Sequence, residues 1–473
     1  MIAAQPLNDR SLHRHARHVS IPTYDRSTLT PGVVHISVGA FHRSHQAVYF
    51  DELARRGLGD GWAITGVALH RRDLKAALDP QDGLYTVVSR GPAGDSARVV
   101  GVLTRYLYAP QQRSAVLAAL SDRRTRLVTL TITTDGYDVD LQTGLFVGDH
   151  PAIRGDVLHP ASPCSALGYL VEALDRRRRA GLPPFTVLSC DNLVNNGAIA
   201  RAAVIGMAGR RDRRLAAWID EHGAFPGSLV DRITPGTTDA DRAMVARAFG
   251  VRDRCPVMTE PFSQWVIEDA FCDGRPPLDE VGARFVDDVR PYALAKTRLL
   301  NASHVALGHL GALAGYTRLD ETMSDPTLAG FVRSMMDDEI APLLPPIGID
   351  LRQYTACLSS RFANPKLADP LVRLCRNGSA KVTTHLVPSV RDARARGRSS
   401  RLLTLAVAGW ILYLRSSDRG LRHLLADESI FGPLARCAEF AADVSRDLAE
   451  LEAYGVHAAL RRRSTCESVA AVG

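Results

Sequence analysis

A lysine, an asparagine and a histidine stand close together in the segment PYALAKTRLLNASHVALGHLG, at Lys296, Asn301 and His304. Such a set could take up a proton and stabilise a nearby oxygen that gains charge. Lysine is scarce in this chain, because only four of its 58 basic residues are lysines. Arginine keeps its proton in proteins, whereas a desolvated lysine can lose one. Lys296 is therefore a candidate general base.

The spacing of these three residues is compatible with one shared site. On an α-helix that advances about 100° per residue, their side chains fall within roughly 140° of one face. The same spacing also fits a core helix with a snorkelling lysine, a capping asparagine and a hydrogen-bonded histidine. Spacing alone favours the second interpretation, and the scarcity of lysine makes the two comparable.

Length and composition indicate a soluble protein of two domains. A chain of 473 residues exceeds what one hydrophobic core usually supports, and 46% hydrophobic with 23% charged residues is ordinary for a globular protein. The eight cysteines include no C-x-x-C pair, which favours free thiols in a reducing compartment and argues against a cysteine zinc site. The N-terminus lacks the apolar core of a secretory signal, and the apolar run Leu402 to Leu414 is too short for a membrane span. These features predict a cytoplasmic protein.

The net charge of +7 raises the question of nucleic acid binding. Nucleic-acid grooves usually combine basic charge with aromatic side chains, and the dense basic runs of this chain contain none. We therefore expect solvated helix faces and no nucleic-acid partner. The runs are Arg176 to Arg179, Arg210 to Arg214, Arg391 to Arg401 and Arg461 to Arg463.

Strand-like and helix-like segments alternate in the first part of the chain. GVVHISVGAF, from Gly32, predicts a strand that ends in a glycine turn, and a helical pattern follows it to Gly57. Further strand-like runs alternate with helical ones, as in a doubly wound, Rossmann-like α/β sheet. From about residue 286 the pattern is mostly helical. The predicted domains are therefore residues 1–285, which bind a dinucleotide, and residues 286–473, which hold the substrate and the catalytic groups.

The turn after the first strand is where a dinucleotide pyrophosphate would bind. Free backbone amides and a helix N-terminus both favour an anion there. The motif is not a full G-x-G-x-x-G, and a turn without a ligand fits this segment about as well. At the end of the second strand, Asp73 could hold a ribose and Arg72 could accommodate a 2′-phosphate, so NAD is expected and NADP is possible. The turn comprises Ser37, Val38, Gly39, Ala40, Phe41, His42 and Arg43.

Several segments together resemble the mannitol dehydrogenase family of long-chain polyol dehydrogenases, which includes fructuronate reductases. They run in the expected order from about residue 20 to about residue 460. The most specific are SLVDRITP and the helix with Lys296, Asn301 and His304. The others are VHISVGAFHRSHQAVYFDEL, LTITTDGY, SCDNLVNNGA, EPFSQWVIED and RFANPKLADPLVRLCRNGSAK.

This resemblance implies a zinc-independent hydride transfer between a nicotinamide cofactor and a secondary alcohol of a linear polyol or sugar acid. Lys296 would be the general base, and Asn192 and Asn301 would donate hydrogen bonds to the developing alkoxide. His304, Asp231, Arg373 and Lys381 match positions that bind substrate or belong to the active site. Like-charge repulsion from Arg373 and Lys381 would help Lys296 to lose its proton.

Three residues depart from the family pattern. Ser37 replaces the usual first glycine of the turn, and Arg72 stands beside Asp73 where members often carry an acidic pair. Ala293 replaces a glutamate often found three residues before the lysine, which bears on proton exchange with solvent.

Alternative functions remain open at this level. Mannitol oxidation is the first expectation, with fructuronate reduction or another polyol such as arabinitol as alternatives. A protein of another class, which binds a nucleotide without turnover, is the competing hypothesis. A monomer or weak oligomer without a membrane partner is expected.

Overall fold

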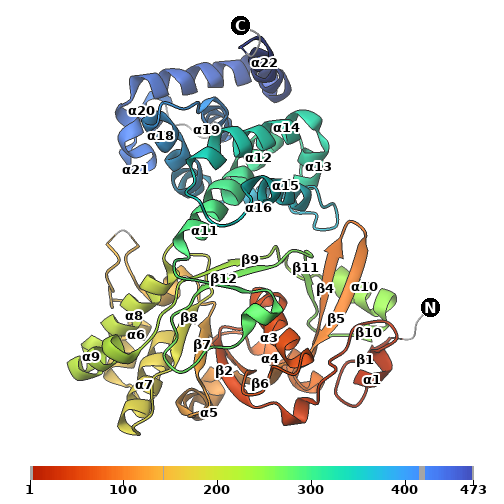
Figure 1. The fold of residues 1–473 in the computed structure, drawn as a ribbon, viewed down its shortest axis with the longest axis vertical. Helices are drawn as coiled ribbons and strands as arrows, with labels where there is room; N and C mark the ends of the chain where they lie inside the picture. Colours follow the sequence, from red (N-terminus) through yellow and green to blue (C-terminus); the bar gives the residue numbers. More distant parts are fainter. Residues whose placement is uncertain (1–3, 142, 415–420, 471–473) are drawn as a thin grey trace. The chain divides into compact units, whose positions relative to one another are not determined.

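The structure is a computed structural model that describes residues 4–141, 143–414 and 421–470. The chain divides into two compact units, unit 1 (Met1–Arg290) and unit 2 (Pro291–Gly473). Figure 1 shows strands and helices in unit 1 and helices in unit 2. The doubly wound α/β class predicted for the first part, followed by a mostly helical part, is confirmed.

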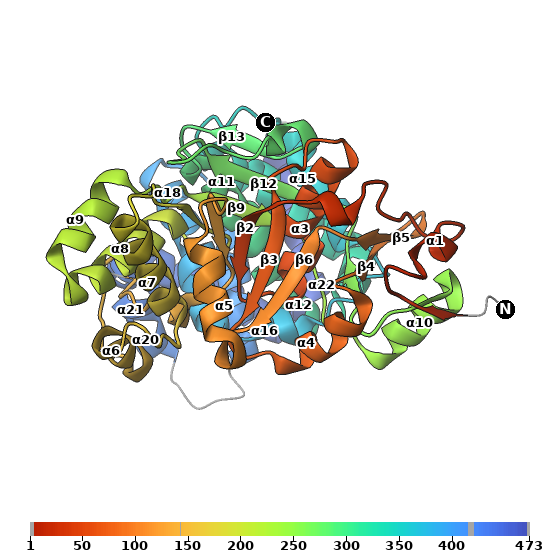
Figure 2. The same ribbon diagram turned by 90° about the horizontal axis from the view of Figure 1, so that it is seen from below.

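Unit 1 is organised around a five-stranded parallel sheet with the order β6-β3-β2-β7-β8, of which Figure 2 shows β2, β3 and β6 side by side. Sequence order runs outward from β2 in both directions, which places the carboxyl end of β2 at the point where the winding reverses. Ligands of open α/β sheets bind outside the carboxyl ends of the strands at such a point. The strands are β2 (Pro31–Ile36), β3 (Ala63–Ala68), β6 (Leu103–Tyr108), β7 (Leu127–Leu130) and β8 (Thr186–Ser189).

Both faces of this sheet are covered, as the continuous apolar strands require. Val34 and Val128 of one face belong to a core that α5, α7 and α8 cover. Val33 and Leu127 point to the other face, where α3 and the indole of Trp265 pack. The alternation follows from the two-residue period of a strand.

The helices of unit 1 alternate with these strands. Their bounds are α1 (Leu12–His15), α2 (Ala40–Ser44), α3 (Gln46–Arg55), α4 (Arg72–Leu78), α5 (Ala109–Ser121), α6 (Pro151–Leu158), α7 (Ala166–Arg179), α8 (Asn196–Arg211), α9 (Arg213–His222) and α10 (Asp239–Phe249).

Three smaller sheets complete unit 1. One has the two strands β1 and β10, and the other two have three strands each, in the orders β11-β4-β5 and β13-β12-β9. Their bounds are β1 (Gln5–Pro6), β4 (Tyr85–Gly91), β5 (Gly94–Val100), β9 (Ser228–Asp231), β10 (Val251–Arg252), β11 (Val257–Thr259), β12 (Gln264–Glu268) and β13 (Arg284–Val286).

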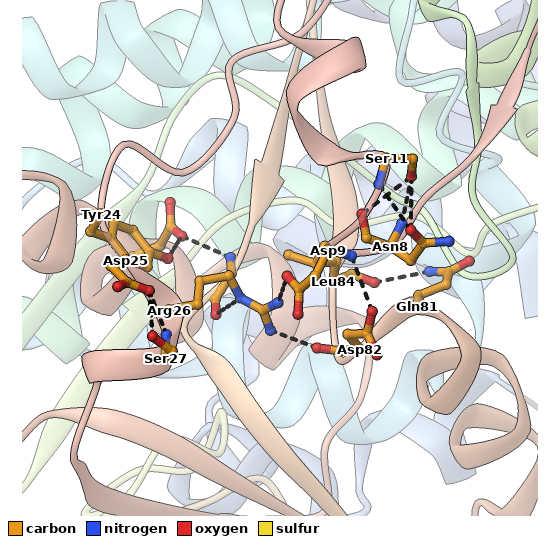
Figure 3. A network of polar contacts seen from close by, with 12 residues as sticks. Asn8, Asp9, Ser11, Tyr24, Asp25, Arg26, Ser27, Gln81, Asp82 and Leu84 are labelled. Carbon is orange, nitrogen blue, oxygen red and sulfur yellow. Dashed lines mark hydrogen bonds and ion pairs between the residues drawn. The ribbon is translucent and has the colours of Figure 1, made fainter.

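A polar network ties the segment before β2 to the rest of unit 1 (Figure 3). The Arg26 guanidinium donates to the carbonyl of Gly101 at 2.9 Å and to that of Asp82 at 2.6 Å, and it pairs with Asp9. The amide of Asp9 in turn donates to the Asp82 carboxylate at 3.0 Å. These bonds fix a segment that has little regular structure of its own.

Unit 2 contains helices and no strand among its described residues. Its core includes the helix of the apolar run at Leu402 to Leu414, which is buried from Leu402 to Ile411, as predicted. No helix in the described part of the chain is long and apolar enough to cross a membrane. In the described part of unit 2, three π-helical segments interrupt the α-helices, at η5 (Lys296–Asn301), η6 (Met335–Ile340) and η8 (Val382–Leu386).

The α-helices of unit 2 pack around that core. They are α11 (Arg290–Ala295), α12 (Ala302–Leu313), α13 (Leu319–Ser324), α14 (Pro326–Ser334), α15 (Leu351–Phe362), α16 (Leu371–Cys375), α17 (Gly378–Lys381), α18 (Val387–Ala395), α19 (Arg401–Leu414), α20 (Leu421–Leu425), α21 (Glu428–Phe431) and α22 (Ala438–Ala470).

Acidic side chains pair with the first two arginine runs. Arg178 and Arg211 both pair with Asp175, at 2.9 and 2.7 Å. Arg176 pairs with Glu172 at 2.7 Å. Much of the basic charge of these runs is therefore neutralised within unit 1.

Candidate functional site

The turn after β2 is held in a conformation that few residues adopt. Ser37 has a φ of +75°, in the left-handed region that favours glycine. Its amide donates to the carbonyl of Val67 at 2.8 Å, and the Thr131 hydroxyl donates to its carbonyl at 2.9 Å. The departure from glycine noted in the sequence therefore falls at a position where glycine would be the unstrained residue.

The buried imidazole of His35 supports this turn through the hydroxyl of Thr131. His35 on β2 contacts the Thr129 hydroxyl at 2.7 Å and the Thr131 hydroxyl at 3.0 Å. Since Thr131 gives its proton to Ser37, it accepts one from Nε2 of His35, which assigns the neutral tautomer. Burial lowers the pKa of His35 to about 3, so the ring stays neutral near pH 7.

The start of α2 offers backbone amides to an anion. Gly39 is the N-cap of α2, and no side chain caps its amides. A β-carbon at Gly39 would meet nothing closer than the Ser37 carbonyl oxygen, at 3.9 Å, so the backbone there is open to a close approach. This geometry fits the pyrophosphate of a dinucleotide.

The side chains of His42 and Arg43 are both buried. The His42 ring is buried and stacks on His35, with ring centroids 3.4 Å apart. The Arg43 guanidinium donates to the carbonyls of Gly39 and Cys255. In this part of the turn, the groups that remain for a cofactor are backbone amides.

At the end of β3, the Asp73 carboxylate, which was expected to hold a ribose, forms an ion pair with Arg71. Arg71 donates to both oxygens of Asp73, at 2.9 and 2.7 Å, and this hydrogen bonding lowers the pKa of Asp73. Arg72 is exposed beside this pair. The sequence suggested Arg72 and Asp73 for this role, and it did not predict the pairing of Arg71 with Asp73, which depends on side-chain geometry.

The end of β8 is fixed by Asp191, the residue before Asn192. Its buried carboxylate accepts hydrogen bonds from the amides of Ile132 and Thr133, at 3.0 and 2.9 Å, and from the Tyr137 hydroxyl at 2.6 Å. These bonds connect the ends of β7 and β8. Burial nevertheless raises the pKa of Asp191. Asn192 follows this anchor and is exposed.

Asn196 links β8 to β9, the strand that ends at Asp231. Its side-chain amide donates to the carbonyl of Ser228 at 2.8 Å and to that of Asp191 at 3.1 Å, and its oxygen accepts from the amide of Ser228 at 2.9 Å. Asp231 is buried at the end of β9. Asp191 and Asn196 were missed because their role is to hold other elements in place, although the motif SCDNLVNNGA contained both.

In unit 2, Lys296 and Asn301 are the first and last residues of a π-helical segment. The sequence interpretation placed them on a regular α-helix, and this was wrong. In a π-helix the hydrogen bond runs to the fifth residue, which brings residues five apart closer to one face. Lys296 is buried, with 9% of its surface exposed. His304 lies one turn further, with its ring 4.7 Å from that of Phe362.

The two other cations predicted for the site have partners within unit 2. Lys381 donates to the carbonyls of Leu374 and Arg373, at 2.8 and 3.2 Å. The exposed Arg373 side chain pairs with Asp369, with one hydrogen bond of 2.6 Å. Burial, and after it the charge of Arg373, lowers the pKa of Lys381.

The residues predicted for the site lie neither at a metal-binding cluster nor along the cavity that the structure describes. No group of three histidine, cysteine or acidic side chains in the described ranges could hold a metal ion. Every cysteine with a described side chain is a free thiol. A cavity of about 520 Å³ lies beside β6, where Arg26, Lys75 and Tyr106 are among its lining residues, and none of the predicted site residues line it.

Comparison with known proteins gives matches over both units. Residues 31–280 match the family model of the mannitol dehydrogenase Rossmann domain, and residues 288–455 match that of the mannitol dehydrogenase C-terminal domain. Mannitol 2-dehydrogenase of Phaeosphaeria nodorum is 43% identical over 432 residues, which cover 90% of this chain and 76% of the relative. Mannitol dehydrogenase 2 of Saccharomyces cerevisiae is 42% identical over 420 residues, which cover 88% and 84%.

Solved structures show the same similarity. The Pseudomonas fluorescens mannitol 2-dehydrogenase ternary complex with NAD and D-mannitol has a TM-score of 0.85 and 39% identity, and the match covers 98% of this chain and 100% of that one. A D-sorbitol dehydrogenase in substrate-free form has a TM-score of 0.89 and 34% identity, with 96% and 100% covered.

The strain at Ser37 leads to a stability prediction. Ser37→Gly should raise the free energy of unfolding slightly, since relief of about 1 kcal/mol of left-handed strain exceeds the added chain entropy of about 0.5 kcal/mol. Ser37→Val should lower it by about 2 kcal/mol, because a β-branched residue tolerates a positive φ poorly. Denaturant unfolding of both variants measures the difference. Equal stability of the glycine and valine variants would contradict the assigned conformation.

Proposed function

The chain belongs to the mannitol dehydrogenase family, and from this premise we propose that it is an NAD-dependent polyol dehydrogenase that interconverts D-mannitol and D-fructose. The resemblance predicted from the sequence motifs is confirmed by both family models. The observation that carries the proposal is the match over both units to a mannitol 2-dehydrogenase whose complex contains NAD and D-mannitol. The relatives compared above support the same substrate class.

The nicotinamide cofactor, when bound, supplies the hydride acceptor. The open backbone at Gly39, after the switch point of the sheet, is the part of this chain that fits its pyrophosphate. NAD is proposed as the cofactor, and NADP as a second possibility because of Arg72. The protein contributes binding, orientation and electrostatics to the reaction.

Lys296 is proposed as the general base. It takes the proton of the substrate hydroxyl during oxidation and returns it during reduction of the ketone. Lysine can do this and arginine cannot, because the guanidinium does not give up its proton. Burial of Lys296 and its place in a π-helical segment support this role, since such segments are frequent at functional sites. The reaction proposed here needs no zinc.

Amide and imidazole groups are assigned to the reacting oxygen and its neighbours. Asn301 donates a hydrogen bond to the alkoxide that forms as hydride leaves, and Asn192 of unit 1 is assigned the same role. A fixed donor of this kind is worth about 3 kcal/mol in the transition state. His304 is proposed to orient the substrate in unit 2. Asp231 is proposed as a substrate-binding residue of unit 1.

The partners of the cationic residues favour a neutral polyol over a sugar acid. Arg373 already pairs with Asp369, and Lys381 donates two hydrogen bonds to backbone carbonyls. A carboxylate substrate would have to compete with Asp369 for the guanidinium. The remaining N–H groups of the two side chains can donate to sugar hydroxyl oxygens without breaking this pair. Both residues are proposed to bind substrate hydroxyls.

The substrate assignment is tested with the purified protein and NADH. Absorbance of the reduced nicotinamide is followed with fructose and with fructuronate in separate reactions. Oxidation of NADH with fructose is expected. Oxidation only with fructuronate would transfer the proposal to sugar-acid reduction, and binding of NADH without turnover of either substrate or of related ketoses would favour a non-catalytic nucleotide-binding protein.

Removal of the proposed base should separate turnover from cofactor binding. Lys296→Met should lower kcat for mannitol oxidation by about 100-fold or more, while the dissociation constant of NADH changes little. Lys296→Arg is the matched control, because it retains the positive charge and cannot accept a proton. Steady-state kinetics and fluorescence titration of NADH give both quantities. Activity of the arginine variant near that of the unaltered protein would remove Lys296 as the base.

The pair at the end of β3 should control the choice between cofactors. Arg71→Ala releases the Asp73 carboxylate for the ribose hydroxyls, and Arg72→Glu adds a second acid, so both should raise the preference for NADH over NADPH. We expect a change of about tenfold in the ratio of kcat/KM values, equivalent to about 1.4 kcal/mol. An unchanged ratio in both variants would show that this segment does not contact the ribose.

A further inference from the structure

His385 lies in the π-helical segment η8, which packs against the π-helical segment of Lys296. The two segments are far apart in the sequence and adjacent in unit 2. The imidazole is half-buried, and its Nδ1 is buried without a hydrogen-bond partner in the described structure. A buried ring nitrogen without a partner is uncommon, because burial of a polar atom costs free energy that a hydrogen bond would offset.

The charged groups that act on this imidazole are both lysines. The ammonium groups of Lys381 and Lys296 repel a positive charge on the ring, and no carboxylate among the described residues offsets them. Two other basic side chains of the packed elements have partners of their own. Arg298 donates to Ser389 and Asp392, and Nδ1 of His309 contacts the carbonyl of Val305 at 2.8 Å.

We propose that His385 exchanges the proton of Lys296 with solvent during each turnover. This inference rests on the proposed function, since it concerns the proton that Lys296 takes from the substrate. His385 is not assigned a contact with the reacting oxygen. It acts through Lys296, and it is therefore a positioning residue and not the catalytic base.

The exchange conserves atoms and charge. During oxidation the hydroxyl O–H bond breaks and an N–H bond forms on Lys296. The lysine stem is flexible and can then present its ammonium to Nδ1 of His385, where one N–H bond breaks and another forms. The imidazolium releases its Nε2 proton to water, and the neutral ring then returns to the tautomer with an unprotonated Nδ1, as water takes the Nδ1 proton and gives one back to Nε2. One proton per hydride transferred therefore reaches the solvent.

The protonation state of His385 suits this role. Burial, then the charges of Lys381 and Lys296, lower its pKa to about 4 against a backbone hydrogen bond with Thr384 that raises it, so the ring is neutral near pH 7. Transfer from Lys296 removes one of the repelling charges, which favours the imidazolium at that moment. Repulsion from the lysines then drives release of the proton to water.

The test follows two signals in one stopped-flow experiment on mannitol oxidation by the full-length protein, in weak buffer with a pH indicator. Absorbance of NADH reports the hydride step, and the indicator reports proton release. In the unaltered protein both signals should rise together. In His385→Ala, proton release should lag behind NADH formation by about tenfold in rate, because the relay group is absent. Added imidazole should abolish the lag.

Two further variants separate this role from a structural one. His385→Gln retains a polar side chain of similar length and cannot titrate, so it should show the same lag if folding is preserved. His309→Gln is the matched control, because His309 is also buried near Lys381 and is not coupled to Lys296. Thermal unfolding of each variant reports whether the fold is intact.

The outcomes distinguish the two proposals. Formation of NADH without a lag in either His385 variant would overturn the relay and leave the polyol dehydrogenase assignment standing. A lag of the same size in His309→Gln would also overturn it. Absence of NADH formation in the unaltered protein would refute the proposed function, and the relay with it.

Discussion

The site in unit 1 depends on buried polar groups finding partners at the carboxyl ends of parallel strands. Asp191 is the clearest case, because its carboxylate joins the end of β7 to the end of β8 through two backbone amides and a tyrosine hydroxyl. His35 performs a similar task at β2, where it supports Thr131 and through it the turn at Ser37. A buried group of this kind is costly when unpaired, so these contacts fix the loops that carry the candidate residues.

Unit 2 presents its candidate residues from helices that change their hydrogen-bonding pattern locally. Lys296 begins one π-helical segment, and His385 lies in another. A π-turn gives up regular α-helical bonding, and its cost is tolerated where the altered side-chain direction is useful. The basic groups gathered in this region then act on one another electrostatically. Lys381, held by two carbonyls, supplies one of the fixed charges.

Much of this arrangement could be predicted from the sequence because it depends on local patterns. Periodicity and residue type predict the apolar strand before Ser37, the turn at Gly39 and the apolar helix after Arg401. The π-helical turns were not, since α- and π-helical segments have similar hydrophobic patterns. Nor was the pairing of Arg71 with Asp73, which is decided by side-chain geometry. His385 belongs to no motif, and its significance arises only from packing against a distant segment.

The reaction proposed for this protein depends above all on Lys296, which accepts the substrate proton as hydride leaves. Its most direct test is the pH dependence of the single-turnover rate of NADH formation from mannitol, in the unaltered protein and in Lys296→Arg. The rate of the unaltered protein should rise with pH and level off after one ionisation. The arginine variant should be slower at every pH and should keep rising with hydroxide concentration. Coinciding pH profiles for the two proteins would contradict the claim.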